Sequence, residues 1–273
     1  GDVYKRQPQY QFTVPEDPAL SFAGKAGKTY YSAPATVNGN QNPIWIGFGA
    51  DTELPVDSFR DNIASLDLLS VDGPGEVEMF GYYPGPGGLQ RFFGTSEGAP
   101  RSAWLTSGTH THNYTVFSKP GRYRLTYRTT ARGKDGTLIT SAPTTTSIQV
   151  GGQRPADNAT PTLKERFDAA PSGDPSAENY QLSIAPKQKA DKPGDEHLST
   201  IDFTGGSDGT LTLLIDGYFL TDLPVKAGKA HWEELLGPEA SSLQAVYTPA
   251  GAKPRWVSEK LSYTCLLYTS PSP

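Results

Sequence analysis

The stretch from Gly108 to Arg128 constrains the fold of this chain more than any other. From Arg122 to Arg128 apolar and polar residues alternate strictly, which is typical of a half-buried antiparallel strand. A second alternating run precedes it and ends in Lys-Pro-Gly, a sequence that favours a turn. The segment therefore predicts a hairpin of two β-strands, with three apolar side chains in the core: Tyr123, Leu125 and Tyr127.

The composition extends this prediction to the whole chain of 273 residues. It contains 29 glycines and 24 prolines, aromatic residues make up 11%, and charged residues only 19%. Many short strands with Gly/Pro turns explain this mixture better than helices do. We expect an all-β fold of two immunoglobulin-like β-sandwich domains joined by a polar linker. The larger sandwich is expected over residues 9–152, the linker over 153–177 and the smaller sandwich over 178–264.

Two short helical segments are predicted among the strands. Pro55 and the acidic Asp57 indicate one helical turn over Asp57–Asn62. His231–Leu236 is the best short helix of the second domain, and it would place Glu233 and Glu234 on a helix surface, facing apart. The apolar run Pro43–Gly49 indicates a buried strand.

Both ends of the chain differ in character from the rest. Residues 1–8 and 265–273 resemble the translated adapter sequence that recurs at the ends of reading frames from environmental assemblies. We expect these segments to be artefacts and the natural protein to continue in both directions. The single cysteine, Cys265, falls in the second segment, so we expect no disulfide and no zinc–cysteine site in the native part.

Charge and hydropathy exclude two classes of partner. A net charge of −5 argues against nucleic acid, because phosphate binding needs a concentrated basic surface. The arginines of the Arg122–Arg128 strand are interpreted as its solvent face. No apolar run approaches the ~20 residues that a membrane-spanning helix requires.

The pair His110 and His112 is the main chemical feature of the sequence. Two histidines separated by one residue on a strand point the same way, roughly 6–7 Å apart. Such a pair can hold Zn²⁺ if a neighbouring strand or loop adds a third ligand. His197 and His231 belong to the other domain, so a carboxylate or a distant loop would have to supply that ligand. The alternative is structural, with one imidazole packed beside Tyr114 and the other bonded to backbone.

Two further patterns bear on function. Gly94-Thr-Ser-Glu-Gly98 matches the nucleophile elbow of hydrolases, but no helix pattern follows it, so Ser96 is interpreted as a turn residue and no enzyme is predicted. A surface strip of aromatic residues would favour carbohydrate or peptide binding, whereas core packing is the ordinary alternative. Trp104 and Tyr114 are the candidate binding residues of this kind.

The order of motifs in this region also resembles a known family. The matching residues are His110, His112, Asn113, Phe117, Lys119, Pro120, Gly121, Tyr123, Asp135, Gly136, Val150 and Gly151. The series is similar to the repeat domain of actinobacterial surface-anchored proteins, which have a choice of C-terminal anchor. The resemblance covers roughly Asn42–Gly152 and departs from the expected pattern at Tyr114, where we expect the family to carry Trp.

This resemblance implies a secreted, cell-surface-anchored protein that is often encoded near a metal-type ABC transporter. On that basis we predict a non-enzymatic extracellular display or binding module. Its ligand would be a divalent metal such as zinc, or a metal complex, held at His110 and His112 for the associated transporter. The alternative is an adhesin-like module that binds glycan or protein and whose histidines are purely structural.

Overall fold

The computed structural model describes residues 11–36, 46–50, 53–83, 88–152, 179–187, 189, 191, 198–236 and 241–263. The suspected artefact ends, the predicted linker at 153–177 and His197 lie outside these residues. The chain divides into two compact units. The first is built mainly from Val3–Ser118 and Tyr123–Ile148, the second from Lys119–Arg122 and Gln149–Pro273.

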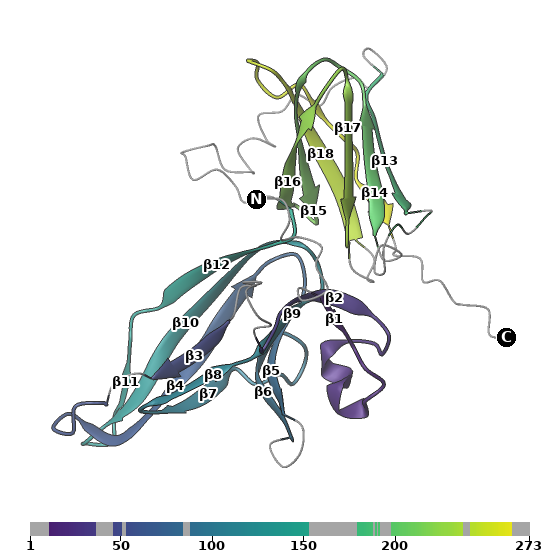
Figure 1. Ribbon diagram of the computed structural model, residues 1–273. Coiled ribbons are helices and arrows are strands. Elements are labelled where there is room, and N and C mark those ends of the chain that lie inside the picture. The colour runs from purple at the N-terminus through teal and green to yellow at the C-terminus, as the bar shows by residue number, and fades with distance from the viewer. Residues whose placement is uncertain are drawn as a thin grey trace. The chain divides into compact units, whose positions relative to one another are not determined.

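Apart from one short helix, all the regular secondary structure of the described residues is β-strand, so the predicted all-β sandwich fold is confirmed (Figure 1). The first series of strands is β1 (Gln11–Thr13), β2 (Thr29–Ala33), β3 (Gly47–Ala50), β4 (Phe59–Asp72), β5 (Val77–Tyr83), β6 (Gly88–Gly94), β7 (Ser102–Thr106), β8 (Thr109–His112), β9 (Tyr114–Phe117), β10 (Gly121–Gly133), β11 (Leu138–Thr140) and β12 (Thr144–Val150). The second series is β13 (Gln181–Pro186), β14 (Ser199–Thr204), β15 (Gly209–Ile215), β16 (Tyr218–Val225), β17 (Lys229–Glu234), β18 (Ser241–Pro249), β19 (Trp256–Val257) and β20 (Leu261–Tyr263).

Two sheets form the sandwich of the first unit. One has the strand order β1-β2-β9-β5-β6 and the other β11-β10-β4-β7, with β12 also paired to β10. Aromatic rings from the two sheets meet between them: Phe117 and Tyr123 have ring centroids 4.9 Å apart, and Phe93 and Tyr127 6.0 Å apart. The alternation of β10 therefore fills the core as predicted, with Tyr123 and Leu125 fully buried.

The predicted hairpin across Lys119–Gly121 is wrong. β9 pairs with β2 and β5, whereas β10 pairs with β4, β11 and β12, so the turn passes the chain from one sheet to the other. Alternation marks a half-buried strand but does not say which strand lies beside it. Here the Phe117 and Tyr123 rings contact each other across the sandwich, tilted by 56°, and both are buried.

The alternating run before that turn is split in two at Asn113. β8 pairs with β3, while β9 belongs to the first sheet. The Asn113 side chain is fully buried and donates to the Tyr114 carbonyl and the Thr115 hydroxyl, at 3.2 and 3.1 Å. The histidines thus lie on β8, which pairs with β3, whereas Tyr114 lies on β9 in the first sheet. β3, predicted as a buried strand, has exposed and half-buried residues in alternation.

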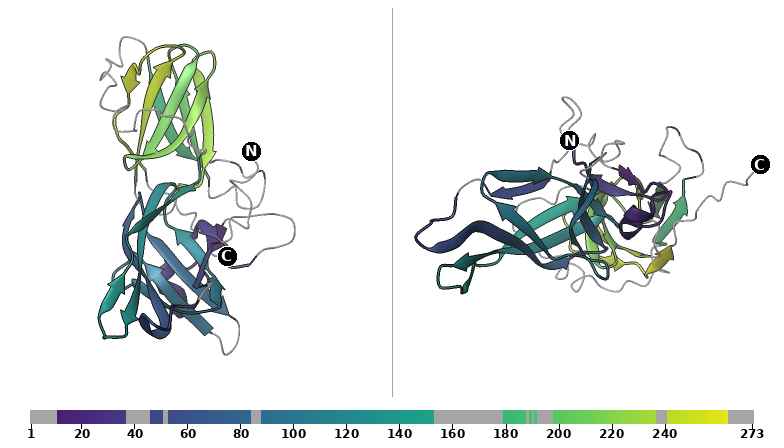
Figure 2. Two further views of the ribbon diagram at one scale, coloured as in Figure 1. Left: turned by 90° about the vertical axis from the view of Figure 1, so that its left-hand side faces the viewer. Right: turned by 90° about the horizontal axis from the view of Figure 1, so that it is seen from below.

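A short 3₁₀ helix, η3 (Pro18–Ala23), covers the outer side of the first sheet. Asp17 caps it by accepting a hydrogen bond from the Ala19 amide at 2.9 Å, and Pro18 occupies its first position. Leu20 and Ala23 pack into a cluster with Val14, Tyr30, Phe80 and Val116 from that outer side. The helix is the purple coil of Figures 1 and 2, and its Phe22 contacts Phe80 of β5 and Arg91 of β6. η3 was not predicted from the sequence, and the turn of helix that was predicted at Asp57–Asn62 is wrong because β4 already begins at Phe59.

The second unit is a smaller β-sandwich with sheets β13-β14-β17 and β16-β15-β18-β19, and β20 pairs with β18. The helix predicted at His231–Leu236 is wrong, because His231–Glu234 belongs to β17 and pairs with β14. Successive side chains there point to opposite faces, so Glu234 is buried beside Trp232 while Glu233 reaches Lys187. Glu and Leu favour helices, but burial of alternate residues decides the conformation here.

Candidate ligand-binding face

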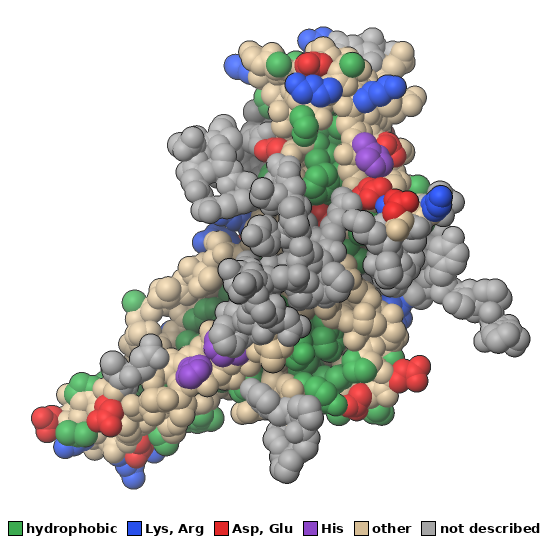
Figure 3. All heavy atoms as spheres, in the orientation of Figure 1, with side chains coloured by type: hydrophobic (Ala, Val, Ile, Leu, Met, Phe, Trp, Pro, Cys, Tyr) green, Lys and Arg blue, Asp and Glu red, His purple; other side chains and the backbone are tan. Residues whose placement is uncertain are grey.

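His110 and His112 lie on the same face of β8, as their spacing requires. Their ring centroids are 5.5 Å apart and the rings are nearly perpendicular, at 77°. His110 is exposed and His112 half-buried, and purple histidine side chains are visible at the surface of the first unit in Figure 3.

Two glycines of β3 lie directly opposite the histidines in the ladder. Gly49 pairs with His110 and Gly47 with His112. A Cβ atom at Gly49 would lie 2.7 Å from the His110 Cβ, and one at Gly47 would lie 2.9 Å from the His112 Nδ1. Because both paired residues are glycines, β3 places only backbone, and no side chain, directly opposite the two imidazoles.

The described residues add no third ligand to this pair. Among them, no group of three or more His, Cys, Asp and Glu side chains is close enough to hold a metal ion. His231 lies in the second unit, where its Nδ1 is 2.8 Å from the Asp202 carboxylate. Within the described residues the pair alone supplies two imidazole nitrogens, so a metal would take its remaining ligands from outside this set, as from water or a bound molecule.

Tyr114, a predicted binding residue, lies in a packed environment. Its ring stacks on Phe80 with centroids 5.5 Å apart and lies 5.4 Å from the ring of Phe12. It is half-buried in the cluster beneath η3. Its immediate neighbours therefore indicate a packing role.

Trp104 lies in the opposite situation, on the outer side of the second sheet. It is the central residue of β7, whose neighbours Ala103 and Leu105 point into the core. The Trp104 side chain is 76% exposed, the most exposed large apolar residue of the described chain. An indole in this position adds nothing to the core, yet offers a flat apolar surface to solvent.

Polar residues lie beside Trp104 on three neighbouring strands, together with the exposed apolar side chain of Ile63 on β4. Trp104 pairs with Ser65 of β4, and Ser65 pairs with Thr130 of β10. In the next row Ser102 pairs with Asp67, and Asp67 with Arg128. Directly paired residues point to the same side of a sheet. We call the resulting surface the open face: Ser65, Asp67, Ser102, Trp104, Arg128 and Thr130.

The Asp67 carboxylate is the centre of hydrogen bonding on the open face. Its Oδ1 accepts from the hydroxyls of Ser102 at 2.7 Å and Ser65 at 3.0 Å. Its Oδ2 accepts from the Thr130 hydroxyl at 2.6 Å and from the Arg128 Nε at 3.4 Å. Burial raises the pKa of Asp67, but the hydrogen bonds from Thr130 and its neighbours outweigh that effect, and the pKa lies below its usual value.

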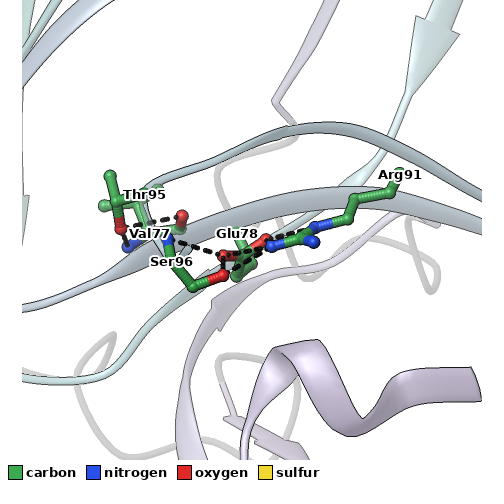
Figure 4. Close-up of polar contacts among 5 residues, drawn as sticks. All are labelled: Val77, Glu78, Arg91, Thr95 and Ser96. Carbon is green, nitrogen blue, oxygen red and sulfur yellow. Dashed lines mark hydrogen bonds and ion pairs between the residues drawn. The ribbon is translucent and has the colours of Figure 1, made fainter. Parts of the chain in front are cut away.

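The covered outer side of the first sheet holds a second carboxylate, Glu78 (Figure 4). Arg91 donates to it twice, from Nε at 2.8 Å and from Nη2 at 2.9 Å. The Arg91 guanidinium also lies 4.4 Å from the centre of the Phe22 ring, so η3 covers the ion pair. The close approach requires glycine at Gly94, where a Cβ would lie 2.2 Å from the carboxylate.

Ser96, the central residue of the sequence match to a nucleophile elbow, belongs to this group of polar side chains. The Ser96 hydroxyl donates to Glu78 at 2.7 Å and accepts from the Arg91 Nη2 at 2.6 Å (Figure 4). Among the described residues no imidazole contacts Ser96, so its proton has no general base of the kind that a serine nucleophile needs. Burial raises the pKa of Glu78, in spite of hydrogen bonds from Ser96 and Arg91.

Comparisons with known proteins find only weak structural likenesses. No family model and no curated protein matches the chain. The fibronectin(III)-like modules of Clostridium thermocellum CbhA are 15% identical over 80% of this chain and 93% of theirs, with a TM-score of 0.24. The class 5 fimbriae chaperone CfaA is 8% identical over 82% of this chain and 99% of its own, with a TM-score of 0.20. Scores this low support no functional argument.

Within the part of the chain that the structure describes, no helix has both the length and the apolar character needed to cross a membrane.

Sequence reasoning singled out Trp104 but not the polar residues around it. A signal was present in the run Ile63–Leu68, where Ser65 and Asp67 occupy alternate positions between apolar residues. That pattern places both on the solvent side of β4. The convergence of Ser102 and Thr130 on Asp67 had no sequence signal, because these residues are 35 and 63 positions away from it.

Proposed function

We propose that this chain is a non-enzymatic, extracellular binding module that takes a glycan on the open face. The observation that carries the proposal is Trp104, 76% exposed at the centre of its strand. Sugar rings present flat faces of C–H groups, which stack on indole rings, and their hydroxyls need polar partners beside the stacking surface. The open face supplies both within two rows of one sheet.

Extracellular placement rests on the resemblance of Asn42–Gly152 to surface-anchored repeat domains. In that setting the module would be displayed at the cell surface. Its partner would be a polysaccharide outside the cell.

Affinity electrophoresis tests this function. The full chain is run in native gels that contain xylan, a β-1,3-glucan, a mannan or hydroxyethyl cellulose. We expect at least one polysaccharide to retard the parent and Trp104→Ala to weaken that binding at least about tenfold, since the stacking surface is lost. Tyr82→Ala is the matched control, because Tyr82 is an exposed aromatic residue of the other sheet, at 47%. Absence of retardation in all four gels, or equal loss in both variants, would contradict the proposal.

A second candidate function is binding of a divalent metal by His110 and His112. The observation that favours it is the pair of imidazoles on one face, 5.5 Å apart and bordered by Gly47 and Gly49. Under this alternative the module would present zinc, or a metal complex, to the transporter components that the family resemblance implies.

Zinc calorimetry distinguishes this candidate. The double variant His110→Ala/His112→Ala should lose a binding step that the parent shows. His231→Ala is the control, because this histidine lies in the second unit and pairs with Asp202. Equal heats from the parent and the double variant would reject the metal site and leave the histidines a structural role.

A further inference from the structure

The direction of the hydrogen bonds on the open face decides what the face can recognise. An ionised carboxylate has no proton and only accepts hydrogen bonds. Ser102 and Thr130 must therefore each donate their one hydroxyl proton to Asp67, at 2.7 and 2.6 Å. Each hydroxyl oxygen then keeps lone pairs that can accept from a ligand.

The position of these hydroxyls suits a ligand that lies across the strands. Ser102 is on β7 and Thr130 is on β10, on either side of the β4 strand that carries Asp67. Trp104 lies two residues from Ser102 on the same face of β7. A ring stacked on the indole can therefore direct hydroxyl groups toward Ser102, and a neighbouring ring can direct them toward Thr130.

Arg128 complements these acceptors. Its Nε points to Asp67 at 3.4 Å, and its side chain is 42% exposed. A guanidinium carries five N–H donors, so four remain after the bond to Asp67. These can donate to ring or hydroxyl oxygens of the same ligand.

We propose that Asp67 is a positioning residue that fixes the Ser102 and Thr130 hydroxyls as acceptors, so that the open face selects sugars with free hydroxyl groups. This inference rests on the proposed glycan site and adds its specificity. A glycan whose hydroxyls are capped as methyl ethers keeps its apolar ring faces but has no proton to donate. It would stack on Trp104 but leave both acceptors without a hydrogen-bond donor. Unpaired polar groups in a binding site reduce affinity strongly.

The test compares each polysaccharide of the gel series with its partly O-methylated form. For a polysaccharide that retards the parent, we expect methylation to weaken binding at least about tenfold. Asp67→Asn should reduce this discrimination, because the amide NH₂ donates to one hydroxyl and forces that hydroxyl to turn its proton outward. Trp104→Ala should weaken binding of both forms together.

The outcomes separate this inference from the function on which it rests. If the parent binds no polysaccharide, the glycan function itself fails. If the parent binds native and methylated forms equally, or if folded Asp67→Asn discriminates as the parent does, the role of Asp67 is refuted while the glycan site stands. Should Asp67→Asn fail to fold by circular dichroism, Ser102→Ala and Thr130→Val decide, since each removes one acceptor. Unchanged discrimination in both would equally refute the role.

Discussion

The two outer sides of the first sandwich contain the same chemical groups in contrasting surroundings. Each has a carboxylate that accepts from serine hydroxyl and arginine: Glu78 on the first sheet and Asp67 on the second. Over Glu78, η3 and Phe22 form a cover, and the side chain is only 4% exposed. The Asp67 side chain is 15% exposed, with no helix of the described chain over it, and Trp104, one row away, is 76% exposed.

This difference separates structural polar groups from those available to a ligand. Beneath η3 the side chains of Glu78, Arg91 and Ser96 form hydrogen bonds with one another. These bonds stabilise a charged pair inside a covered layer. On the open face Ser65 is buried, but the Ser102 and Thr130 hydroxyls that donate to Asp67 retain acceptor capacity. The same residue types thus stabilise the fold on one sheet and can recognise a ligand on the other.

The largest effect should come from breaking the covered pair. We expect Glu78→Ala to lower the free energy of unfolding by about 4 kcal/mol, because it leaves the Arg91 guanidinium covered and without its carboxylate. Asp67→Ala should cost only about 1 kcal/mol, since two of its partners, Ser102 and Arg128, are exposed and can turn to water. Urea denaturation measures both. Equal costs would mean that the cover by η3 makes no energetic difference.

A second comparison removes apolar groups from the two sides. Leu20→Ala should lower the free energy of unfolding by about 3 kcal/mol, because Leu20 is 1% exposed in the cluster beneath η3. Trp104→Ala should change it by less than about 0.5 kcal/mol, as expected of an exposed side chain. Thermal or urea unfolding checks the pair, and a large destabilisation by Trp104→Ala would assign the indole a packing role instead.

The smallest effect is a pH dependence of opposite sign at the two carboxylates. The pKa of Asp67 is lowered in the fold, so its stabilising contribution is present above the unfolded pKa of about 3.9 and is lost as the pH falls through the folded pKa. The pKa of Glu78 is raised, so its contribution is present below the unfolded pKa of about 4.3 and is lost as the pH rises through the folded pKa.

Unfolding measured between about pH 3 and pH 7 tests these signs. The stability difference between the parent and Asp67→Asn should grow in favour of the parent as the pH rises. The difference between the parent and Glu78→Gln should shrink over the same range. Parallel trends would show that burial by η3 does not govern the protonation of Glu78.

The sequence determined the strands better than their partners. Alternation in Arg122–Arg128 correctly placed Tyr123 and Leu125 in the core, because a period of two belongs to the strand itself. It could not reveal that β9 and β10 lie in different sheets, since pairing depends on which faces pack together. The error at His231–Leu236 has a similar origin, because local helix preference was overruled by packing in the second sandwich.

The candidate site was predictable only in part. Trp104 stands between Ser102 and Thr106 at a spacing of two, so its exposure was readable from the polar residues that share its face. Tyr114 follows a similar alternation, yet η3 and Phe12 pack over it, and no local pattern indicated that cover. The cluster around Asp67 depends on three strands whose register the sequence does not specify.

The distance along the chain between Asp67 and Thr130, 63 residues, has a kinetic consequence. Pairing of strands so far apart in sequence requires closure of a long loop, and contacts of this kind slow folding. During synthesis the open face cannot assemble until β10 has left the ribosome, although β4 has emerged long before. Ligand binding at this face would therefore appear only once β4, β7 and β10 have paired, so it reports the pairing of these three strands.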